Sequence, residues 1–81
     1  MERSDIKAKV YEVINDKLGI PLANIKEESK FVEDLGADSL DEVEIIMALE
    51  DVFDIEISDE EVIGKVMDVK STIDLLEKKV D

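Results

Sequence analysis

Apolar residues recur at three- and four-residue steps in three segments of this chain, and this spacing predicts helices that share a core. The first segment carries its apolar face on Ile6, Val10, Val13, Ile14 and Leu18. Ser4 is expected to be the N-cap of this helix, and Gly19 is expected to end it. No alternating apolar and polar run bounded by turns predicts a strand. The pattern therefore indicates an all-α fold.

Three further helices are predicted along the chain. The second covers Ser39–Phe53, with Asp38 as its N-cap and Asp41 at N3 in an approximate capping box. A short third helix begins after Ser58 within the capping box Ser58–Glu61, and Gly64 is expected to weaken or end it. The last helix begins after Asp68 and ends near Lys79. We expect a small bundle of three main helices plus one short helix.

Residues 19–38 connect the first two helices, and so long a connection is expected to be structured. A helical turn is predicted near Pro21–Ile25, and the connection would let the two helices lie roughly parallel. The apolar residues expected to hold it on the core are Ile20, Leu22, Ile25, Phe31, Val32 and Leu35. The whole chain, residues 1–81, is interpreted as one domain with a long structured loop between its first and second helices.

Charge is distributed unevenly along the chain. Its 23 acidic and 10 basic residues give a formal net charge of -13. Residues 31–64 contain no Lys or Arg, yet they hold 13 of the 23 acids. This charge disfavours binding to nucleic acid and anionic membrane surfaces, and it favours basic protein partners. The acidic block is therefore interpreted as a docking surface.

Several classes of protein are disfavoured by composition. The chain has no cysteine, so it has no disulfide and no thiolate metal site. No apolar stretch approaches the roughly 20 residues of a membrane span. Residues 1–5 lack the apolar segment of a signal peptide. We expect a cytoplasmic protein without membrane insertion.

The second helix has two apolar faces when its residues are placed at 100° steps. The larger face, expected to be core, contains Ile45, Ile46, Leu49, Val52 and Phe53. The smaller, opposite face contains Leu40, Val43 and Met47, with Glu44, Glu50 and Asp51 at its rim. An exposed apolar strip inside an acidic rim is typical of a docking surface. Two alternatives remain open here: the third helix covers the strip, or its members are scattered surface residues.

Ser39 begins the second helix in a chain that has no histidine. With no imidazole, and with Lys30 nine positions away, no base is placed to take the serine proton. The carboxylates nearest in sequence, which would disfavour an alkoxide, are Asp34, Asp38, Asp41 and Glu42. Glycoside hydrolysis by paired carboxylates needs a cleft, for which so short a chain has little room. The chain is not expected to be an enzyme.

The segment around Ser39 also fails as a calcium loop. An EF-hand needs oxygen ligands at positions 1, 3 and 5 and Gly at position 6, whereas counting from Asp34 places Gly36 third and Ser39 sixth. No metal site is predicted, although the clustered carboxylates leave weak divalent binding open as a stabiliser. Gly36 and Ala37 leave the approach to the hydroxyl open, and a helix start favours an attached phosphate ester. Ser39 is therefore interpreted as an attachment point.

The chain resembles the acyl carrier proteins of type II (dissociated) fatty acid synthesis over nearly its whole length. The motif Asp38-Ser39-Leu40, the preceding Leu35-Gly36-Ala37, and the segments Met47–Glu50 and Ile57–Glu61 carry the resemblance. It implies that Ser39 carries covalent 4'-phosphopantetheine, transferred from coenzyme A by a phosphopantetheinyl transferase. The thiol of that arm would hold growing fatty acyl chains as thioesters, which the carrier, a monomer, would shuttle between separate biosynthetic enzymes with basic docking patches.

The resemblance also implies roles for residues around Ser39. Asp38 and Leu40 would adjoin the attached group. The residues implied to contact partner enzymes are Leu40, Asp41, Val43, Glu44, Met47 and Glu50. Those implied to line a pocket for the acyl chain are Ile45, Leu49, Ile57 and Val62. Two alternatives remain open: a carrier of polyketide, D-alanyl or aminoacyl groups, and an unmodified acidic interaction module.

Overall fold

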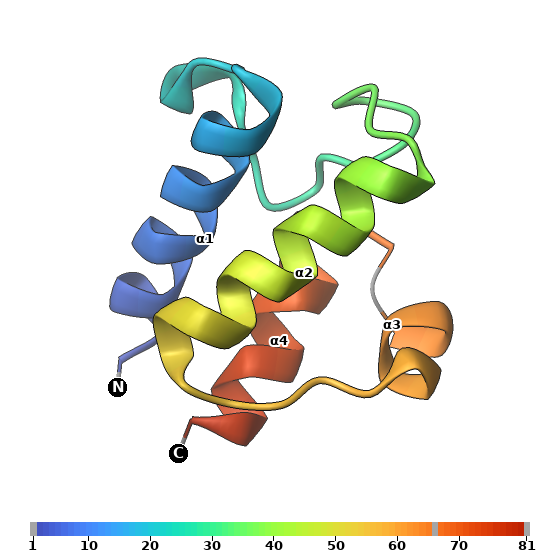
Figure 1. Cartoon of the computed structure of the whole chain (residues 1–81). Coiled ribbons are helices and arrows are strands. Elements are labelled where there is room, and N and C mark those ends of the chain that lie inside the picture. The colour runs from blue at the N-terminus through green and yellow to red at the C-terminus, as the bar shows by residue number, and fades with distance from the viewer. Residues whose placement is uncertain (1, 66, 81) are drawn as a thin grey trace.

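The computed structural model describes the backbone of residues 2–65 and 67–80, and their side chains except those of 63–65. These ranges form four α-helices, α1 (Arg3–Leu18), α2 (Ser39–Phe53), α3 (Asp59–Lys65) and α4 (Val69–Lys79), and a 3-10 turn, η1 (Leu22–Asn24) (Figure 1). The same ranges contain no strand beyond an isolated bridge between Lys30 and Asp68. The prediction of an all-α bundle with three main helices and one short helix is confirmed.

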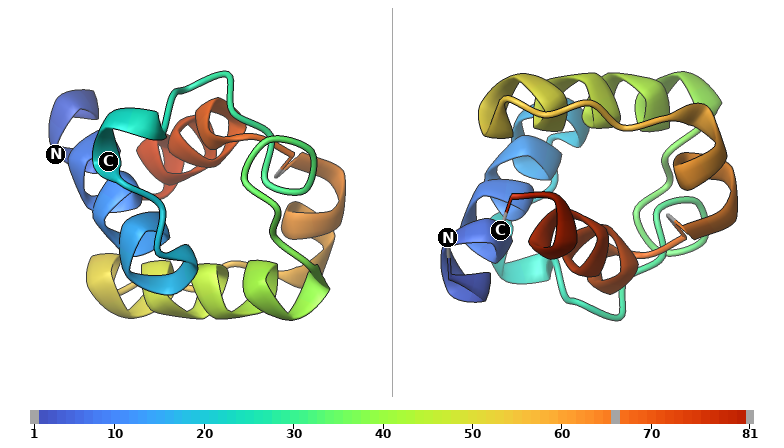
Figure 2. Two further views of the ribbon diagram at one scale, coloured as in Figure 1. Left: turned by 90° about the horizontal axis from the view of Figure 1, so that it is seen from above. Right: turned by 90° about the horizontal axis from the view of Figure 1, so that it is seen from below.

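The helices surround one aliphatic core. α1 packs against both α2 and α4, and α3 packs against α4. Figure 2 shows the four helices arranged around a common centre. The largest side chains fully buried there are Phe31, Ile6, Ile14, Ile45, Leu49, Ile73, Leu76, Val10 and Val69. In Figure 1, α1 leads upward from the N-terminus, whereas α2 leads back downward toward the start of α1 at an angle, so the expectation of two roughly parallel helices is wrong.

Helix α1 begins one residue before the predicted cap. Its N-cap is Glu2, whose side chain makes no capping hydrogen bond, and Ser4 lies inside the first turn. The prediction of Ser4 as N-cap is therefore wrong. The Arg3 guanidinium donates to Asp74 at 2.7 Å and to the Glu27 carboxylate at 3.0 Å. These distant partners hold the first turn in place of a local cap.

The other helix ends follow the local sequence closely. Gly19 ends α1 with a φ of 69°, as predicted, in the left-handed region that favours glycine. Asp68 caps α4, accepting from the Ser71 N–H at 2.8 Å. α3 begins after Ser58 as predicted and runs one residue past Gly64 to Lys65.

The connection from α1 to α2 is attached to the start of α4. The Val69 N–H donates to the Ser29 carbonyl at 3.0 Å, and the Lys70 N–H donates to the Glu27 carbonyl at 2.8 Å. The expected helical turn is confirmed as η1. Of the six apolar residues expected on the core, the buried or partly buried ones are Ile25, Phe31, Ile20 and Leu35. Leu22 and Val32 are exposed, so for these two the prediction is wrong.

One residue of α2 departs from its predicted face. Ile45, Ile46, Leu49 and Phe53 are buried as predicted, but Val52 is 45% exposed. Val52 lies at the edge of the core face, where a groove between α1 and α2 leaves it partly uncovered. Among the described residues, no helix has the length and apolar character needed to cross a bilayer.

Candidate functional site

Ser39 is the first residue of α2, and its surroundings hold it in a fixed position. The Asp41 N–H donates to the Asp38 carboxylate at 2.9 Å, and the Asp38 N–H donates to the Asp41 carboxylate at 3.1 Å. This reciprocal capping box, predicted from the sequence, encloses Ser39 between its two members. Both carboxylates are thereby engaged with backbone donors, so the start of the helix is rigid while the serine is exposed.

The approach to Ser39 is open on the side of the preceding loop. Ala37 is buried, and its N–H donates to the Phe31 carbonyl at 2.8 Å, which anchors the loop to the core. Gly36 has a φ of 71°, and a side chain at this position would meet no atom within 4 Å. The Ser39 hydroxyl makes no hydrogen bond to another residue that the structure describes. A bulky group on this oxygen would extend into solvent.

The apolar strip of α2 is uncovered. Leu40, Val43 and Met47 are 73%, 54% and 59% exposed, so α3 does not cover them. Glu44 beside them is also exposed. Glu50 is half-buried, and its carboxylate accepts from the Ile57 N–H at 2.9 Å, which fixes the connection from α2 to α3. Among the described residues Glu44 at the rim of the strip has no ion-pair partner, whereas the Glu50 carboxylate already accepts a hydrogen bond within the fold.

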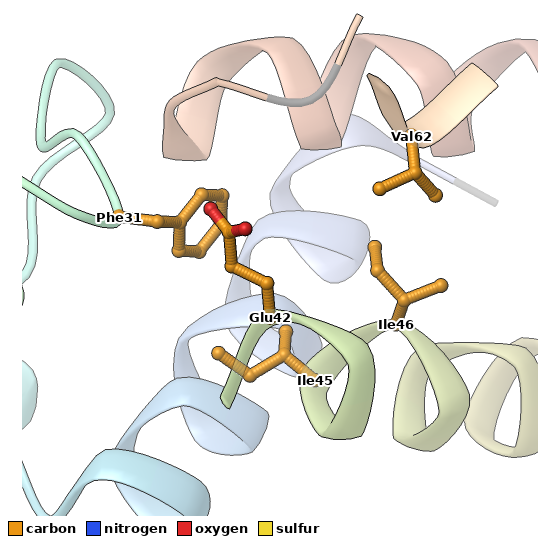
Figure 3. Close-up of a pocket in the computed structure, with 5 residues that line it drawn as sticks. All are labelled: Phe31, Glu42, Ile45, Ile46 and Val62. Atoms are coloured by element: carbon orange, nitrogen blue, oxygen red, sulfur yellow. The ribbon is translucent and has the colours of Figure 1, made fainter. Parts of the chain in front are cut away.

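A small apolar cavity lies between the N-terminal half of α2, the loop and α3. Its lining residues are Phe31, Glu42, Ile45, Ile46 and Val62 (Figure 3). About 10 Å³ of it is accessible to the centre of a water molecule, which is room for about one water. Of the four residues expected to line an acyl pocket, Ile45 and Val62 line this cavity, whereas Leu49 and Ile57 are buried elsewhere in the core.

Three of the lining residues were named from the sequence in other roles but were not predicted to line a pocket. Phe31 comes from the loop, and its position depends on tertiary packing. Glu42 and Ile46 could have been found, because 100° steps place both on the core side of α2. Figure 3 shows the Glu42 side chain extending from α2 toward the side of the cavity where Phe31 lies. A carboxylate on the core face of a helix was the signal that sequence reasoning passed over.

Helix α3 is held beside this cavity by its N-terminal cap and by a contact with α4. The Glu61 carboxylate accepts from the Ser58 hydroxyl at 3.0 Å and lies 3.0 Å from the Lys79 ammonium of α4. These interactions, the one with Lys79 foremost, lower the pKa of Glu61. Val62 follows Glu61 directly, and Figure 3 shows it facing Ile46. The pairing with Lys79 thus positions one wall of the cavity.

Among the described side chains, no three acidic groups converge closely enough to hold a metal ion. The carboxylates of α2 are therefore distributed along the helix and are not gathered into a site. What the arrangement offers chemically is a single exposed hydroxyl at a rigid helix start, next to an uncovered apolar strip.

Comparison with known proteins agrees with this geometry. The model of a family described as "Phosphopantetheine attachment site" matches residues 8–76. The acyl carrier proteins of Chlorobium phaeobacteroides and Chlorobium phaeovibrioides are each 51% identical to this chain over 79 residues. That of Chlorobium luteolum is 49% identical, and each alignment covers 98% of this chain and 100% of the relative. The chain therefore belongs to the acyl carrier protein family, whose members carry acyl groups on phosphopantetheine and are not enzymes.

Proposed function

We propose that Ser39 is the residue that bears 4'-phosphopantetheine and that the chain carries growing fatty acyl groups. The observation that supports this most is an exposed hydroxyl within the capping box of Asp38 and Asp41 that makes no hydrogen bond to any other residue the structure describes. When bound, the group supplies a thiol that holds the acyl chain as a thioester. This chain supplies a rigid tether and a surface by which other proteins recognise it.

The other serines are less suited to attachment. Ser29 is buried. The hydroxyl of Ser58 donates to the Glu61 carboxylate at 3.0 Å, and that of Ser71 donates to the Asp68 carbonyl at 3.0 Å. Ser4 is exposed, but it lies within α1 on a turn that has no capping box. Ser39 combines an open hydroxyl with a rigid support.

The base for the transfer step must come from the partner. The chain has no histidine, and the carboxylates of Asp38 and Asp41 accept backbone hydrogen bonds. In the proposed step the Ser39 Oγ–phosphorus bond forms, the pyrophosphate bond of coenzyme A breaks, and the nucleotide half leaves. The serine proton passes to a base of the phosphopantetheinyl transferase. Ser39 is thus a substrate for another enzyme.

The proposed docking face is the outer side of α2, used by the chain as a monomer. Leu40, Val43 and Met47 supply its apolar contacts, and Asp41 and Glu44 supply negative charge beside them. Basic patches on the transferase and on fatty acid synthesis enzymes would match this surface, and charge complementarity would speed their encounter. Small contacts of this kind exchange rapidly, as a shuttle requires. Glu50 would act mainly through the connection that it fixes.

The cavity beside α3 is proposed as the start of the acyl-chain pocket. Ile45 and Val62 line it already, Ile57 lines a separate hollow beside Ser58, and Leu49 would be reached only after the core opens. Because the cavity holds about one water, a fatty chain must displace α3 or its neighbours to enter. The Glu61–Lys79 pair is the contact such a movement would strain.

The decisive experiment measures the intact mass before and after incubation with coenzyme A and a phosphopantetheinyl transferase. Wild-type protein should gain one phosphopantetheine, and Ser39→Ala should gain none while keeping its helical circular dichroism. Ser4→Ala is the matched control, because Ser4 is exposed in the first turn of α1, and it should load normally. A wild-type protein that stays bare, or a Ser39→Ala variant that loads, would contradict the proposal.

The cargo requires a separate measurement. Mass spectrometry of thioesters on the protein purified from its native host should find fatty acyl groups of increasing length. Polyketide, D-alanyl or aminoacyl groups in their place would reassign the pathway while leaving Ser39 as the attachment point.

A further inference from the structure

A groove between α1 and α2 has no role in the docking face described above. Its lining residues are Glu12, Val13, Asp16 and Lys17 of α1, with Ala48, Asp51 and Val52 of α2. Its volume is about 330 Å³. Val13 is almost fully buried in the floor, whereas Val52 is 45% exposed in the wall. The groove is therefore a concave surface with an uncovered aliphatic side chain in it.

The groove is continuous with the outer face of α2. An adjoining hollow of about 300 Å³ shares Lys17, Ala48 and Asp51 with it and also contacts Glu44 and Met47. A partner bound over Met47 and Glu44 could therefore also contact the groove through one continuous interface.

The charge around the groove defines what it can accept. Its lining includes three carboxylates, Glu12 and Asp16 of α1 and Asp51 of α2, and one ammonium, that of Lys17. Within the described part of the chain, none of these four side chains forms an ion pair. The excess of carboxylates complements a cationic side chain and repels anionic lipid headgroups.

We propose that this groove receives an aliphatic side chain flanked by Lys or Arg from a partner enzyme, which extends the docking surface from α2 onto α1. The inference rests on the proposed function, because the partner is an enzyme that binds the outer face of α2. The partner's aliphatic tip covers Val52, and its cations lie against Asp16 and Asp51. Burying the solvent-exposed Val52 side chain adds apolar contact area to the complex, while the charges add specificity and raise the association rate.

The first test compares two exposed aliphatic positions in the phosphopantetheine-loaded protein. Val52→Ser should bind an immobilised ketoacyl synthase or the transferase about three- to fivefold more weakly than wild type. Leu22→Ser is the control, because Leu22 is 49% exposed on η1 and does not line the groove, and its Kd should be unchanged. A Val52→Ser protein that binds both enzymes as tightly as wild type would overturn the inference. Failure of wild type to load would instead contradict the proposed function.

The second test removes charge without changing shape. Asp16→Asn should weaken binding about twofold at low salt, and the difference should vanish at high salt. Glu28→Gln makes the same change of one charge on the exposed loop and should have no effect. Equal Kd values for wild type and Asp16→Asn at low salt would show that the charge of the groove does not contribute to binding and would overturn the inference.

A third test needs no substitution. Methyl cross-saturation from the unlabelled ketoacyl synthase should reach the methyl groups of Val52 in the wild-type carrier and leave those of Leu22 unaffected. Absence of transfer to Val52 in a complex where Met47 is saturated would show that the partner stops at the outer face of α2.

Discussion

The α1–α4 side of the bundle and the outer face of α2 use charge in opposite ways. On the first, Arg3 bonds Glu27 and Asp74, and the Lys7 ammonium lies 3.3 Å from Glu27. On the second, no acid of α2 has an ion-pair partner among the residues described. The same excess of acid is thus neutralised where it holds helices together and left free where a partner would approach.

The titration of Glu27 reflects its paired environment. Hydrogen bonds from Arg3, then from Lys7, lower the pKa of Glu27 below its ordinary value of 4.5. The hydrogen bond from Arg3 to Asp74, and after it the one to Glu27, raise the pKa of Arg3. Ion pairs at exposed positions contribute little individually, but this cluster joins α1, the loop and α4, which are distant in sequence.

The two regions also differ in how deeply their leucines are buried. Leu76 of α4 is fully buried, whereas Leu40 of α2 is largely exposed next to Ser39. Leu76→Ala should lower the free energy of unfolding by about 3 kcal/mol, because it leaves a cavity in the core. Leu40→Ala should change it by less than about 0.5 kcal/mol. Urea denaturation measures both free energies of unfolding. A similar loss of stability for Leu76→Ala and Leu40→Ala would contradict the difference between a core leucine and a surface leucine.

Asp68 gives the next largest expected effect. Its carboxylate accepts from the Ser71 N–H at the start of α4, and this bond is the main reason that the pKa of Asp68 is lowered from 3.8. Asp68→Ala should lower the free energy of unfolding by about 1 kcal/mol at neutral pH. Because the folded-state pKa is depressed, the contribution is present above 3.8 and lost as pH falls through the lowered value. Denaturation curves of the two proteins should converge in acid; a gap independent of pH would contradict the capping role.

Glu27→Gln tests the paired side of the comparison. It should lower the melting temperature at neutral pH, because it breaks the contacts with Arg3 and Lys7. The pKa of Glu27 is lowered in the fold, so its contribution is present above the ordinary value of 4.5 and is lost as pH falls through the lowered value. In an Arg3→Ala background the same substitution should have a smaller effect. Additive effects would show that the two side chains do not act together.

Glu44→Gln should have the smallest effect on stability and the opposite sign. Glu44 is exposed and, within the described chain, unpaired, so removing its charge relieves repulsion in a protein of net charge -13. We expect the melting temperature to stay the same or rise slightly. A clear decrease, comparable with that of Glu27→Gln, would mean that the acids of α2 also stabilise the fold.

Most of the fold could be predicted because its signals are local. The capping boxes at Asp38 and Ser58 and the left-handed Gly19 lie within a few residues of the helix ends they define. The start of α1 was misplaced because Arg3 is held by Glu27 and Asp74, and no local pattern reveals partners so far along the chain.

The errors at single apolar residues have a related cause. Periodicity indicates which side of a helix faces the core, but the neighbouring helix determines which residues on that side it shields from solvent. In α2, Val52 stays partly exposed because α1 leaves a groove beside it. In the loop no periodicity exists, so Phe31, which is buried, and Val32, which is exposed, could not be told apart. For the site, Ser39 was predicted from its motif and stays a prediction, whereas the cavity needed Phe31 and Val62 to be brought together by folding.

The acids on the exposed side of α2 are proposed to serve partner binding. The measurement that tests it most directly is the association rate of the loaded protein with a ketoacyl synthase, for wild type and Glu44→Lys, at low and high ionic strength. We predict that wild type associates several-fold faster at low salt and that the two rates converge at about 0.5 M salt, where exposed charges are screened. Equal rates at low salt would contradict the claim.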